Sequence, residues 1–305
     1  MKLYSIRQAL VARGLTPAST TSDLRAGRLE DFRIKPARLA EGSRLEARQV
    51  GQAQSWPGPL AYLDSIQRSV VVGYAGAAPL VVGEIAGAVR ERRDRRLHTV
   101  LEERNWFALG RRAALDSAGD AIVELNPVAL PEDDPAHPIR DQVNAARALE
   151  RSRIGLEIAL AERYRSRSDS WLLIDGTLSD SPRWAADARM VAVAKSHSVL
   201  PFDGGDLERY LRLPQGHRSS VYAPESRSLA PLLAWGLRLW PWEGKDLLHG
   251  LVRVEVAPAN GSPESADAIS RWLLAERSPV CAPDRQWDRL LYGLYSVEQY
   301  LKSKA

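Results

Sequence analysis

The sequence feature that most constrains the fold of this chain is a long helical segment that leads directly into an apolar strand. Residues 139–167 are rich in alanine, leucine, arginine and glutamate and contain no proline, so they predict one continuous helix. The run SWLLIDGTL at residues 170–178 is apolar and ends in Asp-Gly-Thr, which predicts a buried strand. A helix followed at once by a buried strand indicates an α/β fold.

Strand-like runs on both sides of this pair extend the predicted sheet. The strands expected are AYLDSIQ, SVVVGYAG, APLVVGEIAGAV, AIVELNPVAL, MVAVAKSHSV, LLAWGLRLW and GLVRVEVAP, and the closing helices are SADAISRWLLAER and DRQWDRLLYGLYSVEQYLKS. Residues 91–112 carry many charges of both signs, which leaves a charged helix or an outer hairpin open. The order predicts a mixed sheet flanked by helices.

The first 58 residues differ from the rest in charge. They hold ten Lys or Arg against five Asp or Glu, so we expect a basic N-terminal arm at 1–58 and one domain at 59–305. Apolar Leu3, Ile6, Leu10 and Val11 are spaced for one helical face. Because this face is small, we expect a partner or a second copy to cover it; the alternative is that the arm packs on its own core.

Composition excludes several classes of protein. A single cysteine, Cys281, excludes an internal disulfide and a cysteine-built zinc site, so any metal would have oxygen ligands. The longest uncharged apolar-leaning run, residues 69–83, is interrupted by glycines and a proline, and the first ten residues lack the apolar core of a secretion signal. We therefore expect a cytoplasmic protein without a membrane partner. The net charge of +4 permits nucleic-acid binding without establishing it.

Two acidic residues lie in apolar strands, where an uncompensated charge is costly. Asp64 falls within AYLDSIQ, and Asp175 ends WLLID. Carboxylates brought side by side repel each other, and Mg²⁺ or Mn²⁺ is a natural compensation because these hard cations prefer oxygen ligands. The alternative for each residue is that it caps a turn, and for Asp175 the following glycine favours that.

The long helix supplies a third acid. With Ile154 at the centre of its apolar face, the helical period turns Glu157 toward the sheet. Glu150, one heptad earlier, faces the same way and remains a rival. The alternative is that either glutamate pairs with a neighbouring arginine in solvent.

The C-terminal segment and one strand end complete the candidate set. Asp284 and Asp288 share a helical row with later apolar residues, and Asp288 is the better placed to be buried. Lys195 ends a predicted strand, where it can hold a phosphate or a carboxylate, and His197 is beside it. Strand acids, a helix acid and an acid from a closing segment form the type of carboxylate set used in two-metal phosphodiester hydrolysis.

Taken in order, these segments resemble the NurA family of DNA-repair nucleases over roughly residues 60–300. LLIDGTL followed by AVAKSHS is the most specific part of the resemblance. It implies a ribonuclease-H-like core, a Mn²⁺-dependent 5′-to-3′ exonuclease and single-strand endonuclease, a homodimer, and a HerA-type hexameric translocase as partner. By position it implies Asp64, Glu157 and Asp175 as metal ligands and Lys195 as an active-site basic residue.

The chain departs from the family pattern at two positions. The first motif usually has Asp-Gly-Ser, whereas this chain has Asp64-Ser65, and a Cβ at Ser65 alters how closely the backbone approaches a metal. A late histidine is replaced by Asp288, which as a carboxylate is a suitable fourth metal ligand. A catalytically inactive DNA-binding or translocase-docking subunit of the same fold therefore remains the alternative function.

Overall fold

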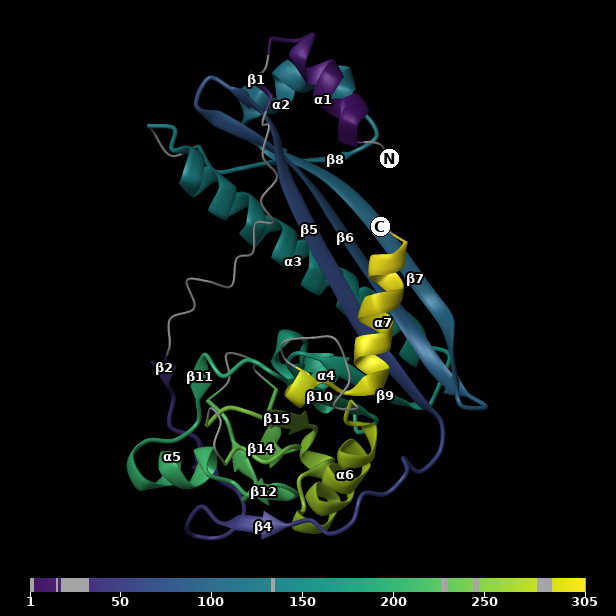
Figure 1. Ribbon diagram of the computed structural model, residues 1–305, viewed down its shortest axis with the longest axis vertical. Helices are drawn as coiled ribbons and strands as arrows, with labels where there is room; N and C mark the ends of the chain where they lie inside the picture. Colours follow the sequence, from purple (N-terminus) through teal and green to yellow (C-terminus); the bar gives the residue numbers. More distant parts are fainter. Residues whose placement is uncertain are drawn as a thin grey trace. The chain divides into compact units, whose positions relative to one another are not determined.

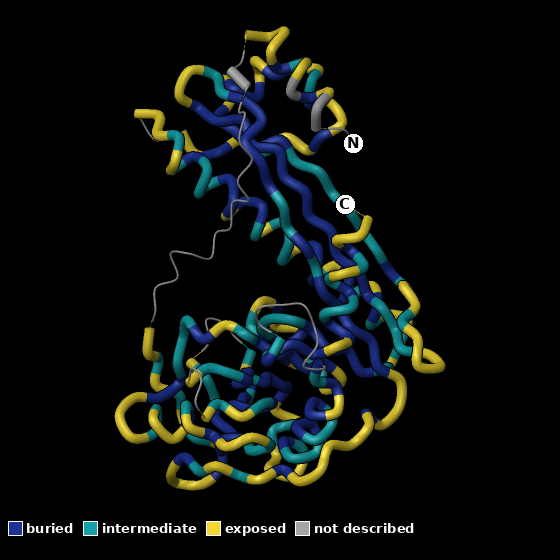
Figure 2. Tube along the Cα trace, in the orientation of Figure 1, coloured by how far each residue is buried: buried dark blue, intermediate teal, exposed yellow. Residues whose placement is uncertain are grey.

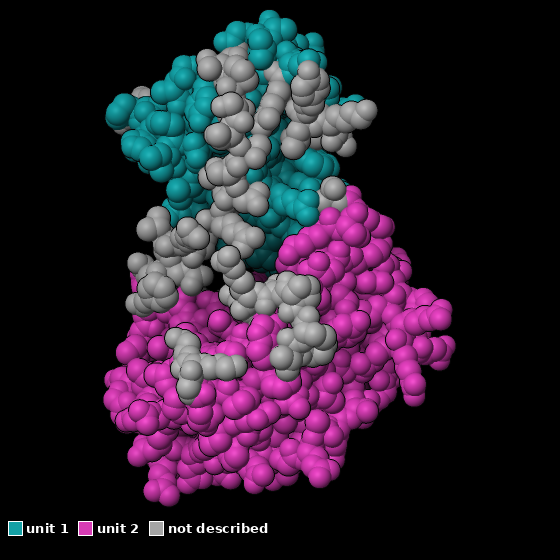
Figure 3. All heavy atoms as spheres, viewed as in Figure 1, with its two compact units in different colours: residues 1–29, 65–87, 102–160 teal, residues 30–64, 88–101, 161–305 magenta. Residues whose placement is uncertain are grey.

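The computed structural model describes residues 3–14, 16–17, 33–132, 135–225, 230–243, 247–278 and 287–304 (Figure 1). The chain divides into two compact units (Figure 3). Unit 1 contains residues 1–29, 65–87 and 102–160, and unit 2 contains residues 30–64, 88–101 and 161–305. The predicted division into an arm at 1–58 and a domain at 59–305 stays a prediction.

Unit 2 is built on a mixed sheet. Its central strands are β14 (Leu233–Arg238), β15 (Leu251–Val256), β10 (Met190–Ala194), β9 (Trp171–Asp175) and the start of β5 (Leu60–Ala75), in that spatial order. β5, β9 and β10 run parallel, whereas β15 is antiparallel to both of its neighbours. The strands predicted from the sequence around Asp175, Lys195, 232–240 and 250–258 are all present, which confirms the mixed α/β sheet.

Short strands extend this sheet and form a second one. On one side lie β13 (Tyr222–Ala223) and β3 (Arg38–Leu39), and β12 (His217–Ser219) pairs with β14 and with β4 (Ala47–Gln49). A separate pair joins β2 (Arg33–Ile34) to β11 (Val199–Leu200) in parallel. Residues from the predicted basic arm therefore contribute strands to unit 2.

Helices α6 (Pro263–Glu276) and α7 (Tyr292–Ser303) pack on one face of the unit 2 sheet; α4 (Pro182–Ala186) and α5 (Gly204–Leu211) also belong to this unit. Ser262 caps α6 by accepting a hydrogen bond from the Ser265 N–H, and Tyr62 of β5 donates to Glu276 at its end, at 2.7 Å. Gly293 in α7 lies directly against the Tyr62 ring, where a Cβ would clash.

The last helix is shorter than its sequence predicts. Residues 284–303 were expected as one helix, but α7 begins at Tyr292, and Trp287–Arg289 forms a separate 3₁₀ turn. Leu291 is extended and bridges Arg277, so the backbone cannot continue a helix through it. Asp284 lies outside the described residues.

Unit 1 contains most of three long strands, β5, β6 (Ala78–Arg93) and β7 (Arg96–Gly110), together with β8 (Asn126–Ala129) and short β1 (Thr16–Pro17). Its helices are α1 (Leu3–Val11), α2 (Arg112–Ala118) and the first part of α3 (Pro138–Arg165). Within this unit, Leu149 of α3 packs so closely on Gly83 of β6 that a Cβ there would overlap the leucine.

The structure corrects one sequence prediction about these strands and decides between two alternatives that the sequence left open. AYLDSIQ and SVVVGYAG are one strand of 16 residues rather than two, because the polar residues between them are accommodated within β5 without a turn. For the charged segment 91–112, the outer hairpin is the alternative that the structure shows, and α2 follows it. The β6–β7 turn is made by Asp94 and Arg95, whose φ angles of 48° and 63° suit a tight hairpin.

The apolar face of α1 is covered by unit 1 itself. Ile6 and Leu10 are buried in a cluster with residues of β5, β6 and α2, including Val70, Val72 and Leu80. The long strands of this unit are buried over much of their length (Figure 2). The expectation that a partner covers this face is therefore wrong for these two residues, because the strands already supply the apolar surface. Val11 is 52% exposed, so it is not part of the buried face. Among the helices that the structure describes, none is long and apolar enough to span a membrane.

Candidate active site

Asp64 and Asp175 lie side by side in unit 2. β5 and β9 are parallel neighbours, with Leu63 opposite Ile174, so the next residue on each strand is one of the two aspartates. Laterally adjacent residues point to the same face of a sheet. Asp64 is only 7% exposed, and Asp175 is half-buried. The prediction that the two acid-bearing strands are adjacent is confirmed.

Lys195 joins this pair from the end of β10. Its Nζ lies 2.5 Å from Oδ2 of Asp175. Burial alone would lower the pKa of Lys195, but the carboxylates of Asp175 and Asp64 outweigh burial and raise the pKa above that of a free lysine. Lys195 is therefore a permanently charged ammonium that compensates two closely placed carboxylates.

Glu298 on α7 is a further acid that interacts with Lys195. Its charge also raises the pKa of Lys195, and its carboxylate pairs with Lys302 one helical turn later, at 2.6 Å. The analysis of the sequence placed the acid of the closing helix at Asp288 and missed Glu298. A usable signal was present, because Glu298 lies four residues after Leu294 and three before Leu301, both buried.

The loop that follows Asp175 is fixed by Glu255 of β15. Gly176 has a φ of 126°, which only glycine adopts readily, so the chain turns sharply after the aspartate. Glu255 then accepts hydrogen bonds from Thr177 Oγ1 at 2.6 Å and from the Leu178 N–H at 2.9 Å. These two bonds hold the loop that carries the Asp175 carboxylate. Sequence reasoning assigned no role to Glu255.

Glu157 belongs to unit 1 and has its own partners there. It is 6% exposed, accepts a hydrogen bond from Arg153 Nη1 at 2.7 Å, and accepts another from the hydroxyl of Ser65. Glu150 is half-buried. Ser65, which replaces the glycine usual in the family motif, thus binds the predicted helix acid.

Asp288 lies in the 3₁₀ turn before α7 and is 4% exposed. It accepts a hydrogen bond from the Gly250 N–H at 2.6 Å and lies 3.4 Å from His249 Nδ1. The neighbouring Arg289 donates to the Lys195 carbonyl at 3.0 Å, which attaches this turn to the strand end that carries Lys195. Asp288 is therefore buried as predicted, although it is not on a helix.

His197 is engaged with the main chain. Its Nε2 lies 2.8 Å from the Leu251 carbonyl oxygen, so the neutral ring donates there. Burial lowers the pKa of His197 to about 4. At neutral pH the ring is uncharged and supports the start of β15.

The donor chemistry of Asp64 and Asp175 fits a hard divalent cation. Two adjacent carboxylates offer the oxygen ligands that Mn²⁺ and Mg²⁺ prefer. Within the part of the chain that the structure describes, no group of three or more His, Cys, Asp or Glu side chains is arranged to hold a metal ion. The metal roles of Glu157 and Asp288 stay predictions from the sequence.

No family model and no curated protein matches this chain. Among solved structures, the NurA nuclease from Sulfolobus solfataricus matches over 84% of this chain and 81% of its own, with 11% identity and a TM-score of 0.54. The chain has the fold of NurA. The catalytic domain of human endonuclease V matches over 99% of this chain and 95% of its own, at 13% identity and a TM-score of 0.35, which is too low to carry an argument.

The NurA match confirms the predicted resemblance at the level of the fold. It covers 84% of this chain and agrees with the predicted mixed α/β, ribonuclease-H-like fold; Asp64 and Asp175 lie on adjacent strands of the observed sheet. At 11% identity it leaves catalysis, metal and partners to be argued from this chain's own residues.

Proposed function

We propose that this chain is a metal-dependent DNA nuclease that hydrolyses phosphodiester bonds with Mn²⁺, or with Mg²⁺ in its place. The observation that carries the proposal is the pair Asp64 and Asp175 on adjacent parallel strands, with Lys195 bound to Asp175, in a chain with the fold of NurA. Carboxylates held close together in a largely buried site are costly for stability, which favours a functional reason for the arrangement.

In this proposal Asp64 and Asp175 hold the cation. A bound Mn²⁺ or Mg²⁺ would activate water and neutralise charge on the phosphate. Lys195 orients the Asp175 carboxylate through its ion pair and brings a positive charge to the position where an anionic phosphate approaches. Glu255 limits the movement of Asp175 by binding the next two residues of the loop.

The finer properties come from the resemblance to NurA alone. They are 5′-to-3′ exonuclease and single-strand endonuclease activity, homodimer formation, and work with a HerA-type hexameric ATPase in DNA end processing or phage defence. An excess of 42 Lys and Arg over 38 Asp and Glu is compatible with a DNA substrate.

One observation favours a second candidate function. Lys195 already pairs with Asp175, and the described residues contain no three-acid group that could hold a metal. An inactive subunit that binds DNA or docks on the translocase would need only the fold and its charged surface. It would bind DNA equally well with and without a divalent cation.

Cleavage assays with purified protein separate the two functions. Labelled linear duplex and single-stranded DNA are incubated with Mn²⁺, Mg²⁺ or EDTA, with and without the candidate translocase. We expect cleavage in Mn²⁺, none in EDTA, and loss of cleavage in Asp175→Ala. Asp206→Ala, which removes an exposed aspartate on α5, is the matched control.

A folded Asp175→Ala protein that cleaves as fast as the wild type would contradict the proposed site. Absence of cleavage by the wild type under every condition, together with retained DNA binding in EDTA, would establish the inactive subunit instead. Circular dichroism and thermal unfolding of each variant show whether the fold is intact.

A further inference from the structure

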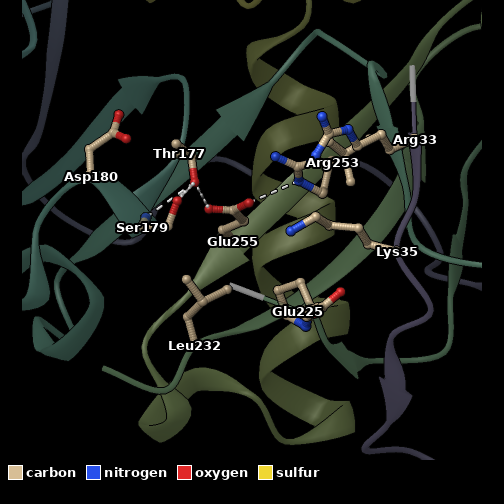
Figure 4. Close-up of a pocket in the computed structure, with 11 residues that line it drawn as sticks. Arg33, Lys35, Thr177, Ser179, Asp180, Glu225, Leu232, Arg253 and Glu255 are labelled. Carbon is tan, nitrogen blue, oxygen red and sulfur yellow. Dashed lines mark hydrogen bonds and ion pairs between the residues drawn. The ribbon is translucent and has the colours of Figure 1, made fainter. Parts of the chain in front are cut away.

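The acid of the Asp175–Lys195 ion pair is fixed by the strand that it ends and by the loop that follows it. Glu255 accepts hydrogen bonds from Thr177 of this loop at 2.6 Å and from Arg253 at 2.8 Å, where all three residues line a pocket of about 410 Å³ (Figure 4). Lys195 needs an anchor of its own, because its ammonium is at the end of a flexible four-carbon stem and is only as well placed as the main chain that carries it.

The main chain at Lys195 lies just beyond the sheet of unit 2. Lys195 directly follows β10, and the pairing of β10 with its two neighbours ends at Ala194, so strand pairing does not reach the Lys195 carbonyl. Arg289 fixes this carbonyl, because its Nη1 donates to the oxygen at 3.0 Å. Two residues later, His197 Nε2 lies 2.8 Å from the Leu251 carbonyl oxygen. The segment 195–197 is therefore attached at both ends.

The turn that carries Arg289 is held by two strands of the same unit. Arg289 ends the 3₁₀ turn Trp287–Arg289, and its Nε lies 3.5 Å from Oδ2 of Asp288. The same oxygen accepts a hydrogen bond at 2.6 Å from the Gly250 N–H, immediately before β15. The Trp287 ring packs edge to face on Trp240, just after β14, with ring centroids 5.5 Å apart. These contacts fix the guanidinium relative to the sheet.

The charge of Asp288 is matched by its own neighbours. Asp288 is 4% exposed, and its Oδ2 faces His249 Nδ1 at 3.4 Å as well as the guanidinium of Arg289. Asp64 and Asp175, in contrast, both act on the one ammonium of Lys195. A carboxylate with a guanidinium of its own is suited to hold that guanidinium in place.

We propose that Arg289 is a positioning residue, which fixes the main chain at Lys195 so that the ammonium stays against Asp175, and that Asp288 holds Arg289 in place. The inference rests on the proposed function, in which Lys195 orients Asp175 and faces the approaching phosphate. A displacement of about 1 Å in a reacting site lowers the rate strongly, so the placement of this ammonium matters for turnover. Arg289 acts through Lys195 and does not itself contact the substrate.

The ammonium of Lys195 can be observed directly, without metal or DNA. The chain has six lysines, so protein labelled with ¹⁵N at the lysine Nζ gives few signals, and Lys195→Met identifies the relevant one. In EDTA we expect the ion pair with Asp175 to displace this signal from those of the exposed lysines. In Arg289→Met the signal should move toward the exposed ones. Arg289→Lys, which keeps a donor, should restore much of the displacement.

Cleavage of DNA in Mn²⁺ should follow the same order. Arg289→Met should lower kcat by about 10–100-fold, as for other outer partners of a metal site, with little change in KM for DNA, and Arg289→Lys should recover part of the loss. In a Lys195→Met background, Arg289→Met should add no further loss, because residues that act through one group are not additive. Arg271→Met is the matched control. Its Nη1 also donates to a main-chain carbonyl, that of Val50 at 3.1 Å, so cleavage and the Lys195 signal should both be unchanged.

Asp288→Asn separates positioning from metal binding. The amide keeps an oxygen for the Gly250 N–H but removes the charge beside Arg289, so the Lys195 signal should shift in the same direction as in Arg289→Met, by less. Affinity for Mn²⁺, measured by calorimetry, should stay at the wild-type value, whereas Asp175→Asn should weaken it. A loss in Asp288→Asn as large as in Asp175→Asn would make Asp288 a metal ligand and overturn its part in the proposal.

An unchanged Lys195 signal in folded Arg289→Met overturns the proposal, whatever the cleavage assays give. A further loss of cleavage from Arg289→Met in Lys195→Met protein also overturns it, because Arg289 would then act by another route. If the wild type cleaves no DNA and the signal still moves as expected, the nuclease is refuted and the contact that fixes Lys195 stands. Thermal unfolding verifies each fold, and Arg289→Gln replaces Arg289→Met if the latter is unfolded.

Discussion

Two buried acid sites, one in each unit, differ in how their charges are arranged. In unit 1, the carboxylate of Glu157 accepts hydrogen bonds from the Arg153 guanidinium and the Ser65 hydroxyl. In unit 2, Lys195 pairs with Asp175, and the charges of Asp64 and Glu298 act on the same ammonium. A carboxylate bound by its own guanidinium is explained by stability alone, whereas several carboxylates gathered around one ammonium mark a place where a further cation would be stabilised.

The largest expected effect is a loss of Mn²⁺-dependent DNA cleavage, which tests whether the two acid sites differ in function. Asp175→Asn keeps the shape of the side chain and removes its charge, so Mn²⁺-dependent cleavage should fall by roughly 10²–10³-fold, the range typical of losing one electrostatic contributor. Glu157→Gln tests the sequence prediction that the acid of unit 1 is also a ligand, and it should lose cleavage too. Glu150→Gln on the same helix is the control and should retain cleavage.

Initial rates on labelled DNA across a Mn²⁺ titration are the measurement. If Glu157→Gln cleaves like the wild type, Glu157 is only a structural partner of Arg153. If Glu150→Gln loses cleavage instead, the metal ligand on the helix is Glu150, one heptad before Glu157.

Removing the shared cation should destabilise unit 2 strongly. Lys195→Met leaves Asp175 and Asp64 without their ammonium, which costs about 3 kcal/mol of unfolding free energy in EDTA, as for other buried pairs that lose one partner. Mn²⁺ should recover part of this loss, because a cation that binds the folded state stabilises it.

Urea unfolding with EDTA and with Mn²⁺ measures both effects. Arg209→Met breaks an exposed ion pair on α5 and should change stability little in either buffer. A Lys195→Met protein as stable as the wild type in EDTA would show that the two aspartates do not depend on this ammonium.

A pH dependence is expected from His197 in unit 2. Its pKa is lowered by burial from 6.5 to about 4, so between these values the unfolded chain binds a proton that the folded chain does not. The contribution of His197 to the free energy of unfolding has its full value above pH 6.5. It decreases as the pH falls toward 4, by roughly 3 kcal/mol in all.

Unfolding free energies of the wild type and His197→Gln between pH 7 and pH 4 test this. The difference in unfolding free energy between the two proteins should become smaller as the pH falls. The wild type loses stability because its unfolded chain gains a proton at His197, whereas glutamine has no proton to gain. Parallel pH profiles would mean that the ring is protonated as easily in the folded chain as in the unfolded one.

The smallest expected effect concerns Ser65 in unit 1. Ser65→Gly restores the glycine usual in the NurA motif, but it removes the hydrogen bond to Glu157 and places glycine within a strand. The expected destabilisation is about 1–2 kcal/mol. Chemical unfolding measures it, and Ser65→Ala, which removes the hydroxyl but keeps the Cβ, separates the hydrogen bond from the glycine effect. A Ser65→Ala protein as stable as the wild type would show that the bond to Glu157 adds no stability.

The sequence by itself determined the regular elements and the pair of strand acids. The helix at 139–167 is nearly the observed α3, and Asp64 and Asp175 are on adjacent strands as predicted, because local composition specifies long helices and apolar strands. It failed at 61–76 and at 284–303, where pairing with neighbouring segments decides whether a strand continues or a helix begins.

Tertiary structure alone decided which charged groups meet. Glu298 and Glu255 are ordinary helix and strand acids in the sequence, and only the packing of α7 and the pairing of β15 bring them to Lys195 and to the loop after Asp175. The pocket that Arg33 and Arg253 both line has the same origin, since these residues are 220 positions apart in the numbering. Contacts between distant segments depend on how the sheet is ordered, and periodicity within one segment carries no information about that order.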